Sequence, residues 1–221
     1  MREEDVIVVG AGLSGICAAY YLAHRCDGIS FKVLEGRENL GGTWDLFKYP
    51  GIRSDSDMYT LGFSFHPWPN PESIADGESI MEYLHETVES YDLLRHIQFS
   101  SRVVRANWSS EESRWILEVR RADGEIEIWK CKWLWGCTGY YRYESGYMPD
   151  FPGAEDFAGE LIHPQLWSED VEWRGKRVVV IGSGATAVTL VPAMAAEAEH
   201  VTMLQRSPTY IMALPEGDRI A

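Results

Sequence analysis

A short apolar run that ends in regularly spaced glycines limits the fold of this chain more than any other stretch. Val6–Val9 is typical of a buried parallel strand, and it leads directly into Gly10-x-Gly12-x-x-Gly15. Small residues then predict a helix over 13–25. In such a unit Gly10 permits the tight turn, Gly12 lets a pyrophosphate approach the backbone, and Gly15 lets the helix pack on the strand. The triplet alone is a weak signal, but this context predicts a dinucleotide-binding unit.

The end of the next predicted strand, Phe31–Glu35, indicates which ribose the unit would bind. Glu35 stands 20 residues after Gly15, where a carboxylate accepts hydrogen bonds from a ribose diol. The positive end of the helix dipole favours the phosphates, and the Ser14 hydroxyl can donate to them. This first site therefore suits the unphosphorylated ribose of FAD or NAD. A glycine-rich turn without a ligand is the alternative.

A second strand–glycine–helix unit begins with the apolar run Arg177–Ile181 and continues as Gly182-x-Gly184-x-x-Ala187. Its next strand, 201–205, ends in Arg206-Ser207, where the first unit has an acid. A guanidinium with a neighbouring hydroxyl binds a 2′-phosphate that a carboxylate would repel. The second site therefore suits NADPH, and two such sites imply electron transfer between bound cofactors. A solvated surface charge is the alternative reading of Arg206.

The remaining pattern predicts an α/β fold with two dinucleotide-binding (Rossmann-type) domains, the first with an inserted β-meander and the second truncated. Apolar residues recur at helical spacing from Ile80 to Tyr91, and β alternation runs over 97–130 with a turn at Asp123-Gly124. We predict a separate strand over 132–136. The predicted domains are 1–140 for FAD, a linker over 141–175, and an incomplete NADPH-binding domain over 176–221.

Composition excludes several classes of partner. Acidic residues outnumber basic ones by 34 to 20, a net charge of −14, so the chain lacks the cationic field that attracts nucleic acid. No apolar run reaches the roughly 20 residues that span a bilayer. The four cysteines form no C-x-x-C pair and no metal-ligand spacing, so we expect no metal, buried structural thiols and a reducing, cytoplasmic location.

Two further stretches resemble the flavin-dependent Baeyer–Villiger monooxygenases. Gly41-Gly42-Thr43-Trp44 with Tyr49–Asp55 is similar to their flavin-contacting stretch. Phe157-x-Gly159-x-x-x-His163-x-x-x-Trp167 matches their signature, although Ser168 stands where the family has proline or aspartate. The resemblance covers the whole chain and is greatest to the mycobacterial ethionamide-activating branch. It implies insertion of oxygen from O₂ into ketones, and oxidation of sulfur compounds, through a C4a-peroxyflavin.

The resemblance also implies which residues bind the cofactors. The positions that match the family's FAD contacts are Ser14, Glu35, Thr43, Trp44, Asp45, Leu46, Asp55 and Val103. The positions that match its NADP contacts are Arg53, Ser54, Asp55, Gly182, Ser183, Gly184, Ala185, Thr186, Ala187, Val188, Arg206 and Ser207.

Asp55 is the predicted catalytic side chain, because the matching carboxylate pairs with an arginine that stabilises the peroxyflavin. We expect it to be buried, since a buried carboxylate needs such a partner. An Asx-turn role within Arg53–Asp57 is the alternative. For His163 we expect hydrogen bonds that couple the two nucleotide domains. The alternative, a histidine of the core or the linker without this role, is nearly as well supported.

Two other functions stay open at the level of sequence. One is a flavin monooxygenase restricted to nitrogen and sulfur, which Trp167 disfavours because that signature has Tyr or Phe there. The other is a nucleotide-binding chain without turnover. No arginine after Asp55 stands in a family-matching position, and the second unit lacks later strands. We therefore expect these residues alone to be a partial enzyme, with a missing C-terminal part, that retains some FAD affinity without oxygenating a substrate.

Overall fold

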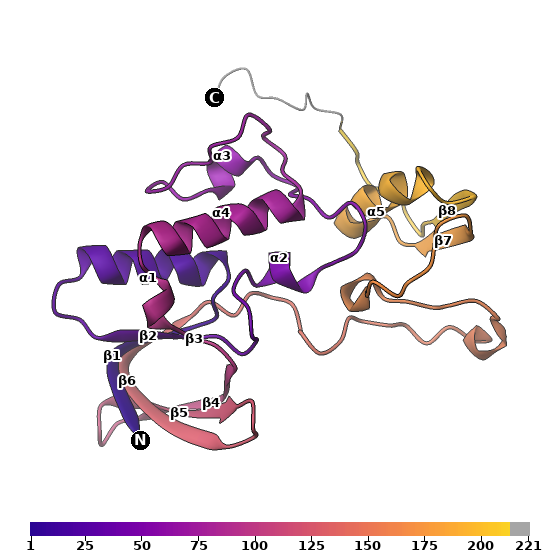
Figure 1. The fold of residues 1–221 in the computed structure, drawn as a ribbon. Helices are drawn as coiled ribbons and strands as arrows, with labels where there is room; N and C mark the ends of the chain where they lie inside the picture. The colour runs from indigo at the N-terminus through magenta and orange to yellow at the C-terminus, as the bar shows by residue number, and fades with distance from the viewer. Residues whose placement is uncertain (213–221) are drawn as a thin grey trace. The chain divides into compact units, whose positions relative to one another are not determined.

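A computed structural model describes residues 1–212 (Figure 1). The chain divides into two units, and each unit consists of two stretches. The first unit contains Met1–Asp45 and Met81–Tyr140, and the second contains Leu46–Ile80 and the residues from Tyr141 onward. The sequence places segment 46–80 in the domain 1–140, but in the structure it packs with the second unit. What each predicted domain binds stays a prediction.

The first unit is built on a six-stranded sheet with the order β3-β2-β1-β6-β5-β4. Neighbours from β3 to β6 are parallel, whereas β6, β5 and β4 form an antiparallel meander. The strands are β1 (Arg2–Val9), β2 (Phe31–Leu34), β3 (Ile97–Gln98), β4 (Ser101–Ser109), β5 (Arg114–Arg121) and β6 (Ile126–Gly136). The predicted inserted meander is therefore present.

The last strand of this sheet differs from the prediction. The separate strand predicted over 132–136 is wrong, because β6 runs without interruption from Ile126 to Gly136. Residues 126–131 pair antiparallel with β5 on one edge, and residues 129–136 pair parallel with β1 on the other, so the two pairings overlap over 129–131. The two pairings cover different parts of the strand, which is why the sequence pattern resembles two strands.

Helix α1 (Leu13–Arg25) matches the predicted helix, and it contacts β1 and β2. Ile7 and Leu34 are buried on one face of the sheet in a cluster with Leu117, and Figure 1 shows β4 and β5 on the other side of β1 from α1. Val8 and Val33 point to the opposite face and are also fully buried. The helix predicted between Ile80 and Tyr91 is α4 (Gly77–Ser90), which η1 (Leu94–His96) follows.

The second unit contains a parallel pair of strands, β7 (Arg177–Ile181) and β8 (His200–Leu204), joined by α5 (Ala185–Ala195). Its core cluster combines two distant stretches of the chain: Phe47, Tyr49, Trp173, Leu190 and Met194. Shorter elements complete the description: α2 (Thr43–Leu46), which crosses from the first unit, α3 (Met58–Leu61), η2 (Ala154–Asp156) and η3 (Pro164–Leu166).

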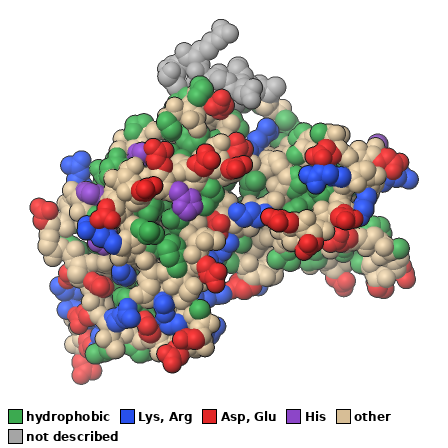
Figure 2. Space-filling model, in the orientation of Figure 1, with side chains coloured by type: hydrophobic (Ala, Val, Ile, Leu, Met, Phe, Trp, Pro, Cys, Tyr) green, Lys and Arg blue, Asp and Glu red, His purple; other side chains and the backbone are tan. Residues whose placement is uncertain are grey.

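The surface agrees with the acidic composition. Figure 2 shows acidic side chains interspersed with basic ones over the visible face. No helix within residues 1–212 is both long and apolar enough to cross a membrane, and this part of the chain has no cluster of metal-ligating side chains. Cys131 is buried, and Cys17 and Cys137 are partly buried, but the expected burial of Cys26 is wrong because its side chain is exposed.

Candidate functional site

The fold itself requires two of the three glycines in the first turn. Gly10 has a left-handed backbone (φ +104°), and its N–H donates to the carbonyl oxygen of Leu34 at 2.9 Å. A Cβ at Gly10 would lie 2.4 Å from the carbonyl oxygen of Cys137, and one at Gly15 would lie 1.8 Å from that of Gly10. Both distances are far inside van der Waals contact, so the packing of β1, α1 and the end of β6 requires glycine at these positions.

Gly12 differs, because the protein leaves room for a side chain there. A Cβ at Gly12 would meet nothing closer than the Cα of Gly42, at 3.5 Å, and its φ of −76° is ordinary. Gly12 is the N-cap of α1, and no side chain caps the helix. The helical bonding starts with the Ile16 N–H, which donates to the Gly12 carbonyl oxygen at 3.0 Å. Open space beside uncapped N–H groups fits a phosphate.

Glu35 lies at the carboxyl end of β2 beside this turn and is buried. Its Oε2 accepts a hydrogen bond from the Ala11 N–H at 2.7 Å, and its Oε1 accepts one from the Arg37 N–H at 2.9 Å. The carboxylate therefore holds the glycine turn against the end of β2. Sequence reasoning predicted a ligand role for Glu35 and missed this structural one.

Arg37 is a residue that the sequence analysis missed. Its Nη2 lies 2.9 Å from the Asp45 Oδ2, and its Nη1 donates to the carbonyl oxygen of Gly42 at 3.3 Å. The Gly41 N–H donates to the Ala11 carbonyl oxygen at 2.9 Å. These bonds fasten the loop 41–45 beside the first glycine turn. No motif indicated this pair, because the burial of Asp45, which requires a cation nearby, is visible only in the structure.

The start of β4 adds a third wall to this region. The Ser101 N–H donates to the Glu35 carbonyl oxygen at 2.7 Å, and the Ser100 N–H donates to that of Arg37 at 2.9 Å. Val103 follows on β4, partly buried against the core cluster of the first unit. Ser14 is exposed on the first turn of α1. Predicted FAD contacts from four segments thus converge at one end of β1 and β2.

The other predicted FAD contacts, Leu46 and Asp55, lie in the second unit with the predicted NADP contacts Arg53 and Ser54. Leu46 is the first residue of that unit, after Thr43–Asp45 in the first. Ser54 is buried, its N–H donates to the Ala75 carbonyl oxygen at 2.8 Å, and its Oγ accepts from the Ala75 N–H at 3.1 Å. Arg53 and Asp55 are exposed. The expected burial of Asp55 is therefore wrong, while its catalytic role stays a prediction.

The second glycine turn repeats the geometry of the first. Gly182 has a φ of +124°, and its N–H donates to the Leu204 carbonyl oxygen at 2.8 Å. Gly184 is the N-cap of α5 without a capping side chain, and the Val188 N–H donates to its carbonyl oxygen at 3.0 Å. A Cβ at Gly184 would meet nothing within 4 Å. This turn too offers open space and uncapped N–H groups. The side chain of Ala187, the third motif position, is buried.

The segment after β8 is tied to this turn. The Ser183 Oγ donates to the Ser207 carbonyl oxygen at 3.0 Å and accepts from the Thr209 hydroxyl at 3.0 Å. Arg206 is exposed in the same segment. The structure thus brings Ser183, Arg206 and Ser207 together, and Thr209 is an addition that no motif in the sequence indicated.

The signature residues have identifiable packing roles. The ring of Phe157 would lie 2.5 Å from a Cβ at Gly159, so this glycine makes room for the phenylalanine. His163 is the N-cap of η3, and its Nδ1 accepts from the Gln165 N–H at 3.1 Å. Trp167 packs against the core cluster of the second unit. The role of His163 between two nucleotide domains stays a prediction.

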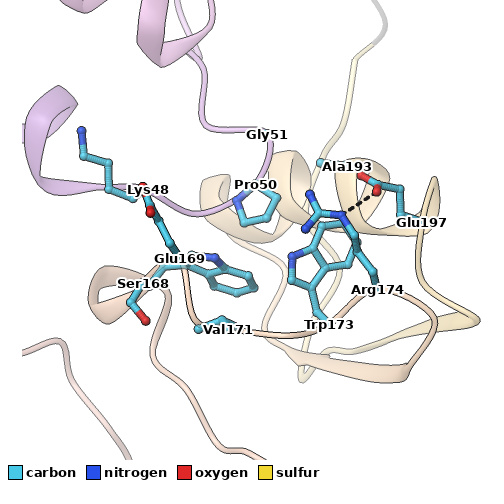
Figure 3. Close-up of a pocket in the computed structure, with 11 residues that line it drawn as sticks. Lys48, Pro50, Gly51, Ser168, Glu169, Val171, Trp173, Arg174, Ala193 and Glu197 are labelled. Carbon is cyan, nitrogen blue, oxygen red and sulfur yellow. Dashed lines mark hydrogen bonds and ion pairs between the residues drawn. The ribbon is translucent and has the colours of Figure 1, made fainter.

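A pocket of about 510 Å³ lies in the second unit, at the C-terminal half of α5 (Figure 3). Trp167 is the only predicted site residue among those that line it. Arg174 lies over the ring of Trp173 at 4.9 Å and forms an ion pair with Glu197 at 2.6 Å. The pocket is therefore distinct from the glycine turn at the other end of this helix.

Comparison with known proteins agrees with this geometry. The family model described as flavin-binding monooxygenase-like matches residues 3–217. The chain belongs to this family. It is 56% identical over 218 residues to the FAD-containing monooxygenase EthA of Mycobacterium tuberculosis, across 98% of this chain and 44% of the relative. It is 53% identical over 218 residues to the probable FAD-binding monooxygenase AlmA of Acinetobacter baylyi, with the same coverage.

The solved structure of a monooxygenase superposes on the chain. Cyclohexanone monooxygenase from Rhodococcus sp. Phi1, bound to NADP⁺, aligns with a TM-score of 0.80 and 32% identity over 95% of this chain and 39% of that one. The predicted α/β class with two Rossmann-type units is confirmed. The chain spans less than half the length of the relatives and of the solved structure that it matches.

Proposed function

We propose that this chain binds FAD at its first glycine turn and NADPH at its second, as the nucleotide-binding part of a monooxygenase. The reaction we propose inserts one oxygen atom of O₂ into ketones to give esters, and oxidises sulfur compounds. The observation that carries the proposal is the opposite charge beside two turns of the same geometry, Glu35 at the first and Arg206 at the second. A free ribose diol prefers the acid and a 2′-phosphate prefers the guanidinium.

The first turn fits FAD in space and in bonding capacity. Gly12 leaves an open cradle at the N-terminus of α1, where a pyrophosphate could meet uncapped N–H groups. The Glu35 carboxylate has about four acceptor positions, and backbone N–H groups of Ala11 and Arg37 use two of them. The others can accept the ribose hydroxyls. The relative EthA is an FAD-containing monooxygenase, which supports the choice of FAD.

The second turn fits a phosphorylated nicotinamide nucleotide. Gly184 leaves the N-terminus of α5 open, and the bonds of Ser183 hold the segment that carries Arg206 beside it. Arg206 is exposed, so its guanidinium can reach a 2′-phosphate without displacing another residue. The NADP⁺ bound to the cyclohexanone monooxygenase supports this choice.

FAD, once bound and reduced, supplies the activation of O₂. The chain's own residues would hold and orient the reactants. Glu35 orients the adenosine ribose, Arg37 fixes the loop that carries Asp45, and Arg206 selects NADPH as the reductant. We propose Asp55 as the catalytic carboxylate, which would orient a cation beside the reacting flavin. Its exposure in the second unit leaves it accessible to such a partner.

The binding part of the proposal is tested first. Calorimetric titration of the purified chain should give FAD binding, and NADPH should bind at least about tenfold more tightly than NADH. Arg206→Ala should remove that preference, whereas Arg177→Ala, at the start of β7, should retain it. Equal affinities for NADPH and NADH in the unmodified chain would contradict the assignment of the second site.

The reaction is tested with ¹⁸O₂. The protein, FAD and NADPH are incubated with a simple ketone or a thioether, and products are followed by mass spectrometry. An ester carrying ¹⁸O supports the proposal. A labelled sulfoxide without any ester assigns the chain to the nitrogen- and sulfur-oxidising monooxygenases instead. Residues 1–221 alone are expected to oxidise NADPH with hydrogen peroxide as the only product, and the same result from a chain of the relatives' length would contradict oxygenation. No oxidation of NADPH at all would favour nucleotide binding without turnover.

A further inference from the structure

Gly51 lets a loop lie directly against the backbone of helix α5. Its φ is +79°, and a Cβ there would lie 2.6 Å from the carbonyl oxygen of Thr189 and 2.7 Å from the Cβ of Ala193. Figure 3 shows Pro50, Gly51 and Ala193 along one side of the pocket, with Trp173 on another. Only a residue without a side chain allows so close an approach of loop and helix.

Larger side chains hold the same loop on the same helix. Phe47 and Tyr49, on one side of Gly51, share a buried cluster with Leu190 and Met194 of α5. Ile52, on the other side, packs against this cluster. The loop is therefore fixed to α5 on both sides of Gly51.

The loop leads directly into the predicted cofactor contacts. Arg53 and Asp55 lie two and four residues after Gly51, both exposed. Their backbone is held from the other direction, because the Gly77 N–H donates to the Ile52 carbonyl oxygen at 2.9 Å and the Ser54 N–H donates to that of Ala75 at 2.8 Å. The position of Arg53 and Asp55 therefore depends on two sets of contacts, those of the loop with α5 and these hydrogen bonds, and loss of the first set would displace both residues.

We propose that Gly51 is a positioning residue that couples nucleotide binding at α5 to the placement of Arg53 and Asp55. This inference rests on the proposed function, in which the N-terminus of α5 takes the pyrophosphate of NADPH. The nucleotide orders the helix, the helix holds the loop through its contact with Gly51, and the loop presents Arg53 and Asp55 in one position. The sequence motif of the loop contains Gly51 but gives no sign of its partner on α5.

The test compares two alanine substitutions at similar backbone angles. Gly51→Ala adds a methyl group against Thr189 and Ala193. Gly153→Ala, at a φ of +82° in the same unit, adds one where nothing lies within 4 Å. Both variants carry the left-handed strain, so their difference isolates the contact with α5. Hydrogen exchange of segment 47–55 is measured in the FAD-free protein with and without NADP⁺.

We expect NADP⁺ to slow exchange of segment 47–55 in the unmodified protein and in Gly153→Ala, but not in Gly51→Ala. With FAD bound, NADPH should reduce the flavin about 100-fold more slowly in Gly51→Ala, since a displacement near 1 Å can cost this factor. FAD affinity should stay within about twofold of Gly153→Ala. Equal responses of the two variants would overturn the inference and leave the proposed function intact.

A second pair of variants approaches the contact from the helix in case Gly51→Ala does not fold. Ala193→Val enlarges the residue that faces Gly51, and Ala195→Val makes the same change at an exposed position of α5. Ala193→Val should lose the NADP⁺-dependent protection of the loop, and Ala195→Val should keep it. Protection in both would overturn the inference. Failure of the unmodified protein to bind NADP⁺ would overturn the proposed function, and this inference with it.

Discussion

Replacing Gly12 and Gly15 separately should distinguish what the fold requires from what the ligand requires. The methyl group of Gly15→Ala would lie 1.8 Å from the Gly10 carbonyl oxygen, where real contacts do not fall below 3.0 Å. Either α1 or the turn must move by more than 1 Å. Overpacking of this kind lowers the free energy of unfolding by ~3 kcal/mol. The better helix propensity of alanine raises it by only ~1 kcal/mol. We expect a net loss of about 2 kcal/mol in the stability of the FAD-free protein.

Gly12→Ala should show the opposite pattern. Its methyl group meets only ordinary contact at 3.5 Å, and the φ of −76° suits alanine. The less favourable N-cap costs about 0.5–1 kcal/mol of stability. The methyl group occupies the space that a pyrophosphate needs to reach the N–H groups of α1. Loss of one charge-assisted hydrogen bond costs ~1.5–3 kcal/mol, so the Kd for FAD should rise by about 10- to 150-fold.

The assay combines calorimetric unfolding of the FAD-free variants with titration of FAD by flavin fluorescence. A Gly12→Ala variant that binds FAD within about threefold of the unmodified protein would refute the assignment of the first turn to the pyrophosphate. A Gly15→Ala variant as stable as Gly12→Ala would refute the packing argument.

Substitutions at three other positions have distinct expected outcomes. Glu35→Ala should lower FAD retention on dialysis and also destabilise the FAD-free protein by about 1–3 kcal/mol, because two backbone N–H groups lose their acceptor; full retention of the flavin would contradict the ribose assignment. Arg37→Met should remove the ion pair that Arg37 makes with Asp45 and weaken FAD binding, and Arg37→Lys should restore only part of the binding, as measured by the same titration. Burial raises the pKa of Cys131 to about 11, above the 9.0 of an unfolded thiol. The buried, neutral thiol therefore adds to the free energy of unfolding below pH 9, and this contribution is lost as the pH rises towards 11. In urea unfolding, the free energy of unfolding of Cys131→Ala should fall less over that range than that of the unmodified protein.

The sequence predicted the elements whose signals are local. The strand, turn and helix around Gly10 could be identified because apolar periodicity and glycine offsets act over a few residues. The full length of β6 could not, because its C-terminal half pairs with β1, which is far away in the sequence. The packing of segment 46–80 with the second unit was not predicted for the same reason: its packing partners, such as Leu190, come late in the chain.

The candidate site divides in a similar way. Motif positions identified the two turns, and the ends of β2 and β8 distinguished their proposed ligands. The contacts that fix those positions were beyond sequence reasoning, since the dual role of Glu35 and the pairing of Arg37 with Asp45 depend on three-dimensional proximity. The exposure of Asp55 shows the limit of argument by resemblance, because a motif carries residue types without their surroundings.

The division of each unit into two stretches has a consequence for synthesis on the ribosome. Val9 pairs with Gly136 across the sheet, so at roughly 5–20 residues per second its strand waits about 6–25 seconds for that neighbour. The loop around Gly51 waits still longer, until Thr189 and Ala193 emerge from the exit tunnel. The nascent chain therefore exposes apolar strands and loops that only later segments can cover. It should depend on chaperones during translation more than a chain whose domains follow one another in order.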